Sequence, residues 1–83
     1  MGAAMPKLTK KQREAMEKNE IRAERANTAL NAYCDIAGTD PDGSVRDLLS
    51  DLMHHCAMSG VDFDDELSSA YMNYRAEKED ESS

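Results

Sequence analysis

The sequence predicts an all-α protein in which one long N-terminal helix is packed by a hairpin of two shorter helices. Apolar residues recur at helical spacing, no stretch alternates with the two-residue period of a strand, and Gly and Pro cluster in short segments between the periodic ones. The 83 residues suffice for one small domain. A chain of this length buries a smaller fraction of its surface on folding than a larger domain does. We therefore expect its core to be compact or completed by a partner.

The first helix is expected over residues 9–37. Thr9 and Gln12 match the Ser/Thr-x-x-Glu/Gln pattern of a capping box, and no Gly or Pro follows before Gly38. The apolar stripe on this helix is strong only in its second half. Its members are Met16, Ala23, Ala26, Leu30, Tyr33 and Ala37. Opposite charges four residues apart support the first half instead.

The second helix is expected over residues 44–59. A Pro-Asp-Gly turn precedes it, and Ser44 is predicted to cap its first turn, with Asp47 near the positive end of the helix dipole. A complete amphipathic stripe makes this the clearest helix of the chain. The stripe consists of Val45, Leu48, Leu49, Leu52, Met53 and Cys56.

The third helix is expected over residues 62–76, because Gly60 ends the second helix and Asp62 and Asp65 can cap the next one. Its apolar positions are Phe63, Leu67, Ala70, Tyr71 and Tyr74. Residues 77–83 are predicted to form an acidic disordered tail. Residues 1–8 are predicted to be disordered or to derive from an expression vector.

The two shorter helices are each about half as long as the first, so we expect them to close on its second half. Residues 9–22 would then have no partner in the monomer. They could protrude as a charged arm, pair with a second copy or fray until a partner binds. We favour pairing or partner capture, through a surface that includes Met16, Ile21, Ala23 and Leu30.

Charge is segregated along the chain, with a net charge of +3 in residues 1–34 and −10 in residues 35–83. The acidic part suits a partner protein with a basic surface, such as a nucleic-acid channel. The candidate contact residues are Asp47, Asp51, Asp62, Asp64, Asp65 and Glu66. The alternative is that these carboxylates only solubilise the surface and cap helix starts.

Direct nucleic-acid binding would depend on the basic first half of the long helix, above all on Lys10, Lys11 and Arg13. Four interleaved Glu residues and the absence of an aromatic residue from this arm disfavour that function. No apolar run is long enough for a transmembrane helix or a signal peptide. We therefore expect a cytoplasmic protein without membrane contact.

The sequence contains no motif of an enzyme, a cofactor site or a metal site. The nearest candidate is the run His54-His55-Cys56, but adjacent helical side chains point about 100° apart and cannot converge on one metal ion. We expect Cys56, on the apolar stripe, to be a reduced and inert thiol. The sequence thus predicts no enzymatic activity, no cofactor and no bound metal.

A Leu-rich helix with His54, a Gly-x-Asp-Phe-Asp turn at Gly60 and a helix with Ala70 and Tyr74 follow one another in the chain. With Asn27 and Tyr33, this pattern over residues 27–77 resembles small all-helical accessory proteins of bacteriophages, prophages and conjugative plasmids. No single activity belongs to that group, and the resemblance implies only a setting, the bacterial cytoplasm.

From this setting and the charge pattern we expect a non-enzymatic protein-binding module. It would be a homodimer that modulates or inhibits a host or defence protein, in the manner of an anti-CRISPR protein. Two alternatives stay open. One is a dimeric nucleic-acid-associated regulator that uses the basic arm, and the other is a scaffold with no partner beyond itself.

Overall fold

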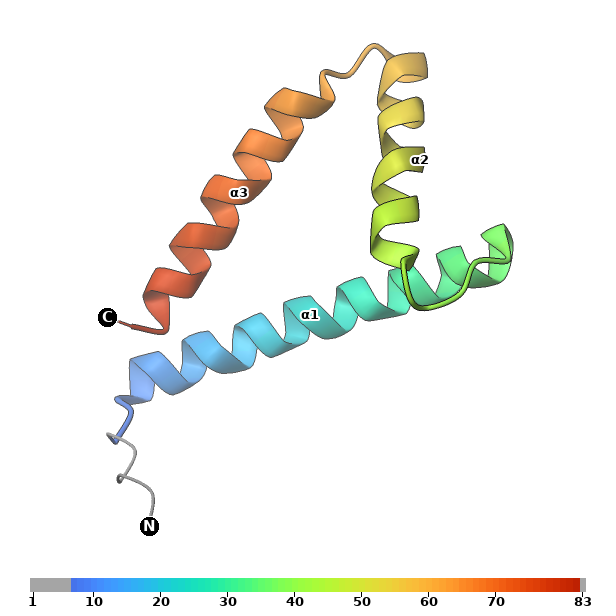
Figure 1. Cartoon of the computed structure of the whole chain (residues 1–83). Coiled ribbons are helices and arrows are strands. Elements are labelled where there is room, and N and C mark those ends of the chain that lie inside the picture. The colour runs from blue at the N-terminus through green and yellow to red at the C-terminus, as the bar shows by residue number, and fades with distance from the viewer. Residues whose placement is uncertain (1–6, 83) are drawn as a thin grey trace.

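The computed structural model describes residues 7–82, which form three α-helices and no strand (Figure 1). The helices are α1 (Lys10–Ala37), α2 (Ser44–Ser59) and α3 (Phe63–Asp80). The predicted fold class is confirmed, because the long first helix packs against two shorter ones. Residues 1–8 were expected to be disordered or vector-derived. Residues 1–6 lie outside the described part of the chain, and Lys7 and Leu8 precede α1 without regular structure.

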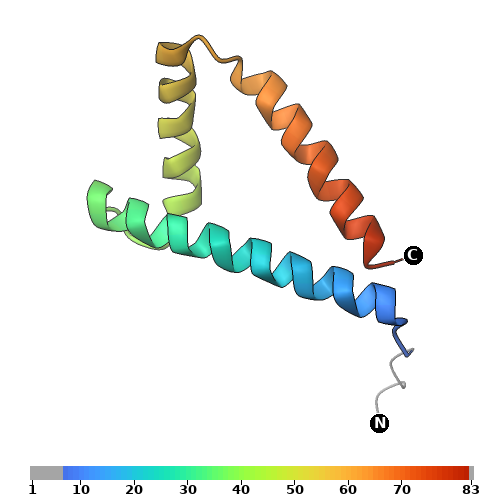
Figure 2. The ribbon, with the colours of Figure 1, turned by 180° about the vertical axis from the view of Figure 1, so that it is seen from behind.

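The three helices form the sides of an open triangular frame rather than a closed bundle (Figures 1 and 2). α2 starts beside the C-terminal half of α1, and α3 returns from the far end of α2 to the N-terminal half of α1. The radius of gyration is 16.8 Å, whereas a compact domain of this length has one of about 12 Å. The accessible surface is 7131 Å², compared with about 4,900 Å² for a compact monomer of this mass.

Both ends of α1 form as the sequence predicts. The Thr9 N–H donates to Gln12 Oε1 at 2.9 Å, and the Gln12 N–H donates to Thr9 Oγ1 at 3.0 Å, which completes the capping box. At the other end, Gly38 has a φ of 69° and its N–H donates to the Cys34 carbonyl at 2.8 Å. Glycine takes this left-handed conformation without steric cost, so α1 stops there.

The start of α2 differs from the prediction that Ser44 caps it. Gly43, with a φ of 90°, is the N-cap residue, and Ser44 is the first residue of the helix. The Ser44 hydroxyl donates to the Pro41 carbonyl at 2.8 Å, and Ser44 is only 1% exposed. Ser44 therefore closes the preceding turn instead of capping α2. In α3, Asp62 does cap the helix, because its Oδ1 accepts the Asp65 N–H at 3.2 Å.

The last turns of α3 correct two predictions. α3 continues to Asp80, so residues 77–80 are helical and not part of a disordered tail. The first half of α1 also has a partner within the monomer. Asn19 Nδ2 donates to the Glu77 carbonyl at 3.0 Å and to Glu81 Oε2, and Arg22 Nε lies 3.0 Å from Glu77 Oε2. We call these four side chains, Asn19, Arg22, Glu77 and Glu81, the α1–α3 latch.

The first half of α1 has a partner because of the angle between the two shorter helices. α2 and α3 diverge from the corner at Gly60, so they do not both close on the second half of α1 (Figure 1). An 18-residue α3 that leaves α2 at this angle reaches the first half of α1 instead.

Little of the frame is buried. Among residues 7–82 the only buried apolar side chains are Ala15 and Cys56, and the only buried polar one is Ser44. Within the described part of the chain, the amphipathic faces of the helices therefore do not combine into an enclosed core. None of the described helices has the length and apolar character needed to cross a membrane.

Candidate functional site

One face of α1 contacts both other helices. Ala15, Asn19 and Arg22 lie on this face near α3, and Ala23 and Leu30 continue it toward α2. These positions are separated by three, four or seven residues, the spacing that places side chains on one side of a helix. The α1 stripe predicted from the sequence is therefore the face along which the frame is assembled.

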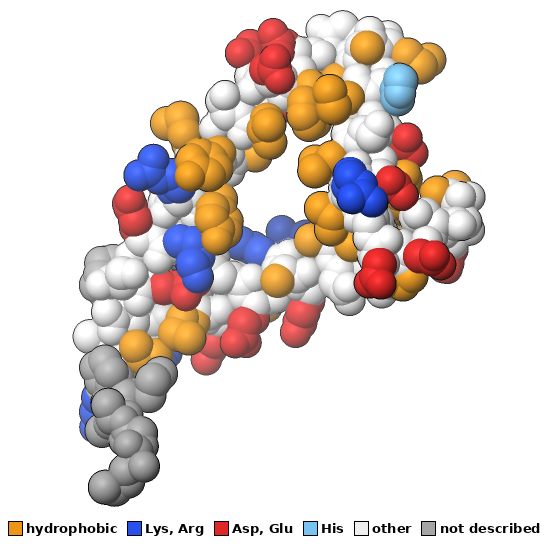
Figure 3. Space-filling view, in the orientation of Figure 1, with side chains coloured by type: hydrophobic (Ala, Val, Ile, Leu, Met, Phe, Trp, Pro, Cys, Tyr) orange, Lys and Arg blue, Asp and Glu red, His pale blue; other side chains and the backbone are white. Residues whose placement is uncertain are grey.

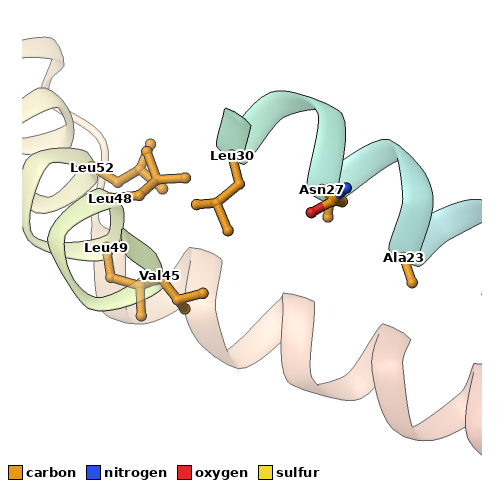
Figure 4. Close-up of a pocket in the computed structure, with 8 residues that line it drawn as sticks. Ala23, Asn27, Leu30, Val45, Leu48, Leu49 and Leu52 are labelled. Carbon is orange, nitrogen blue, oxygen red and sulfur yellow. The ribbon is translucent and has the colours of Figure 1, made fainter. Parts of the chain in front are cut away.

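Between α1 and α2 lies an open groove of about 400 Å³ (Figure 4). The Leu30 side chain points from α1 toward Leu48 and Leu52 on α2. The groove is lined by Ala23, Ala26, Asn27, Leu30, Val45, Leu48, Leu49 and Leu52. Only Asn27 is polar, and no lining side chain titrates. The stripe of α2 thus turns toward α1, but Leu49 remains 42% exposed, because the two helices diverge.

A second apolar surface runs along α3. Phe63, Leu67 and Tyr74 share a helical face with Glu77 and Glu81, whose side chains meet α1 in the latch. These apolar side chains therefore face the inside of the frame, and Figure 3 shows hydrophobic groups around its central opening. Leu67 is 51% exposed and Tyr74 is 57% exposed. We call the α1–α2 groove together with this α3 stripe the inner apolar face.

Two of the predicted acidic residues join α2 to α1 and to the loop that follows α1. The Tyr33 hydroxyl donates to Asp51 Oδ2 at 2.6 Å, and the Thr39 hydroxyl donates to Asp47 Oδ2 at 2.7 Å. The hydrogen bond to Asp51 raises the pKa of Tyr33 to about 12, with further contributions from desolvation and from the charges of Asp51 and Asp47. Asp47 and Asp51 therefore act within the monomer.

The other four predicted acidic residues lie where α3 begins. Asp62 caps the helix, and Asp64, Asp65 and Glu66 are exposed in its first turn. Figure 3 shows acidic side chains gathered at the outer edge of the frame near the start of α3. Among the described residues, no Lys, Arg or His pairs with these three. We call Asp64, Asp65 and Glu66 the acidic corner.

The six predicted acidic residues therefore do not form one surface. Asp47 and Asp51 lie within α2, and the segment from Asp51 to Ser59, about 12 Å long, separates them from the other group. The predicted positions of the second and third helices already implied this separation.

The latch is polar throughout. Arg22 Nη1 donates to Asn19 Oδ1 at 2.7 Å, which orients the Asn19 amide toward α3. The hydrogen bond from Asn19 lowers the pKa of Glu81, with a further lowering from Lys78, whose Nζ lies 3.3 Å from Glu81 Oε1. Sequence analysis missed the latch. The only available signal was the pair of polar residues, Asn19 and Arg22, within the face of α1 that is otherwise apolar.

The four residues of α1 that were predicted to form an interface do not lie on one surface. Ala23 and Leu30 lie in the groove. Met16 is 37% exposed at the edge of the same face, and Ile21 is 56% exposed on the opposite side of α1. Sequence analysis also missed how far Val45, Leu49 and Leu52, predicted as a packed stripe, remain open to solvent.

The basic arm lies beside acidic groups of α3. Lys10, Lys11 and Arg13 are exposed in the first turn of α1. Lys11 lines a shallow hollow together with Glu14 and with Asp80 of α3. The acidic end of α3 thus offsets part of the positive charge that the alternative nucleic-acid function requires.

Cys56 is buried, whereas His54 and His55 beside it are exposed. In residues 7–82 no group of three or more His, Cys, Asp or Glu side chains is arranged to hold a metal ion. No protein-family model, curated protein or solved structure matches this chain. The inner apolar face, the acidic corner and the latch are therefore the features on which a functional interpretation depends.

Proposed function

We propose that this chain is a non-enzymatic protein-binding module that acts as a homodimer. In this proposal a mobile genetic element uses it to modulate or inhibit a host or defence protein with a basic surface. Apolar surface would hold the assembly together, and the acidic corner would direct it to its partner.

The observation that carries the proposal is the unused apolar surface. Val45 and Leu49 on α2 are 60% and 42% exposed, and Leu67 and Tyr74 on α3 are 51% and 57% exposed. Large apolar patches rimmed by polar residues are typical of interaction sites. The groove between α1 and α2 contains no titratable side chain, which favours binding over acid–base or nucleophilic catalysis.

The acidic corner supports the electrostatic part of the proposal. Asp64, Asp65 and Glu66 are exposed, and no cation pairs with them in the described part of the chain. Other acidic residues, such as Asp51 and Glu77, already bond to α1. An unpaired acidic group steers association toward a basic surface and disfavours nucleic acid. The setting in a mobile element rests on the sequence resemblance.

The experiment is an affinity purification from bacterial cells, followed by quantitative binding to the protein that co-purifies. The test variant combines Asp64→Asn, Asp65→Asn and Glu66→Gln. We expect one stoichiometric partner for the natural chain and roughly tenfold or greater weakening for the variant, since three charge contacts are lost at once. Binding should also weaken as the salt concentration rises.

The matched control combines Glu17→Gln, Glu20→Gln and Glu24→Gln, which removes the same charge from the outer side of α1. It should bind as well as the natural chain. Equal loss of partner binding in both variants would mean that binding depends on net charge and not on the acidic corner. The absence of any stoichiometric partner, or full retention by the acidic-corner variant, would overturn the proposal.

A further inference from the structure

We infer that the inner apolar face is the interface at which two copies of this chain associate. The inference deepens the proposed function, because it rests on the homodimer and names the surface that forms it. Each copy would cover the α1–α2 groove and the α3 stripe of the other, and the acidic corners would lie at the edge of the contact.

The amount of exposed surface matches what a stable dimer needs. Each chain exposes roughly 2,200 Å² more than a compact monomer of its mass, counting polar and apolar surface on all sides together. If each copy buried only half of that excess, the interface would bury about 2,200 Å² in total, which lies in the range of obligate homodimers. Such interfaces are also more apolar than transient ones. Within residues 7–82 the α1–α2 groove and the α3 stripe lie on facing sides of the central opening, and both carry exposed apolar side chains.

The obvious alternative occupant is α3 itself, folding inward onto the groove. Two constraints hold α3 away from it. The residues from Gly60 to Asp62 tie its start to the end of α2, and the latch ties Glu77 and Glu81 to α1. Because both ends of α3 are held, its Leu67 and Tyr74 remain exposed.

The charge distribution also favours a second copy. Two chains that each carry a net charge of −7 repel one another overall, so a contact surface without charged side chains adds no further repulsion. The groove satisfies this condition, because its lining contains no Asp, Glu, Lys or Arg. Salt screens the remaining repulsion, so association of the two copies should not weaken as salt rises. Partner binding at the acidic corner should show the opposite dependence.

The first test is molar mass by light scattering over a dilution series at low and high salt. The natural chain should have twice the 9.2 kDa mass of one copy. Leu49→Glu and Leu67→Glu should each weaken association roughly 100-fold or more, since each buries two unpaired charges per dimer. Both positions are half exposed in one copy, so far-UV circular dichroism should still show folded helices.

The matched control is Met58→Glu, an equal change at a nearly fully exposed residue of α2 that does not line the groove. It should remain dimeric. A mass of one chain at every concentration would overturn the inference, as would dimers that persist in both inner-face variants. Loss of the dimer in all three variants would also count against this surface.

The second test locates the contact with a photo-reactive benzoylphenylalanine at Tyr74, in an equal mixture of 15N-labelled and unlabelled chains. Cross-links should join different chains and end in the groove or on the α3 stripe. Cross-links within one chain would show that α3 folds inward, and cross-links to outer faces would indicate another interface. Either result would overturn the inference. A dimer without a bacterial partner would contradict only the partner binding of the proposed function.

Discussion

The hydroxyl of Tyr33 on α1 donates a 2.6 Å hydrogen bond to Asp51 on α2. Beside it, the Thr39 hydroxyl donates to Asp47. The first bond ties α1 to α2 and the second ties the loop after α1 to α2, both on one side of α2, and the apolar groove lies on its other side. The angle between α1 and α2 is therefore held by polar contacts, which leaves the groove open.

The first prediction concerns the pH dependence of this bond. The pKa of Tyr33 is raised to about 12, above the ordinary value of 10, mainly by the hydrogen bond to Asp51. A raised pKa in the folded state means that the contribution to stability is complete below pH 10 and is lost as the pH rises from about 10 to about 12. A titration followed by tyrosinate absorbance should show one late step. Tyr33→Phe should remove it, and Asp51→Asn should move it to lower pH. A late step unaffected by both changes would contradict the assignment.

The second prediction concerns the latch at low pH. The pKa of Glu81 is lowered from 4.5, first by the hydrogen bond from Asn19. A lowered pKa means that this contribution is present above pH 4.5 and is lost as the pH falls through the folded-state pKa. Asn19→Ala should raise the pKa of Glu81, measured by NMR of its carboxyl group, and speed amide exchange in the last turns of α3. Asn31→Ala, elsewhere on α1, should change neither quantity.

The third prediction concerns the capping box. Thr9→Ala removes the oxygen that accepts the Gln12 N–H, and should lower the free energy of unfolding by about 1 kcal/mol in urea titrations. Thr28→Ala is the matched control, because its hydroxyl bonds only to the Glu24 carbonyl within α1. That change should be neutral or slightly stabilising, since Ala has the higher helix propensity. Equal destabilisation by both would argue against the cap.

The fourth prediction concerns the corner between α2 and α3. Gly60 has a φ of 72°, and a Cβ added there would meet nothing within 4 Å. Gly60→Ala should therefore lower the free energy of unfolding by backbone strain alone, about 1–2 kcal/mol. Gly60→Asn should cost less, because Asn tolerates the left-handed conformation. If Ala and Asn cost the same, strain at this glycine is not what sets the stability of the corner.

The sequence was sufficient to predict most of the helix boundaries. The capping box at Thr9, the glycine stop at Gly38 and the Asp62 cap are local features, and each depends on neighbours within four residues. Ser44 and the end of α3 are exceptions. The N-cap of α2 lies one residue earlier than predicted, at Gly43, so Ser44 lies inside the helix and its hydroxyl donates to the Pro41 carbonyl. α3 runs to Asp80 rather than to residue 76.

The arrangement of the helices was harder to predict. The period of a stripe shows which face of a helix is apolar, but it does not give the angle at which the next helix leaves. The divergence at Gly60 brings Glu77 to Arg22 and leaves Leu67 without cover. The acidic residues belong to two different helices, so Asp51 meets Tyr33 whereas the acidic corner lies at the start of α3. The inner apolar face became visible only when this angle was known.

The triangular frame has a geometric consequence for insertions and deletions. Its sides measure about 17 Å along α1 from Asn19 to Leu30, about 24 Å along α2 and about 21 Å along α3 from Phe63 to Glu77. A triangle whose three sides have fixed lengths has only one set of angles. The number of residues in each helix, rather than side-chain volume, therefore sets the shape of the frame. One helical turn added to α2 would change all three angles together, whereas the same insertion in a packed bundle would only lengthen one helix.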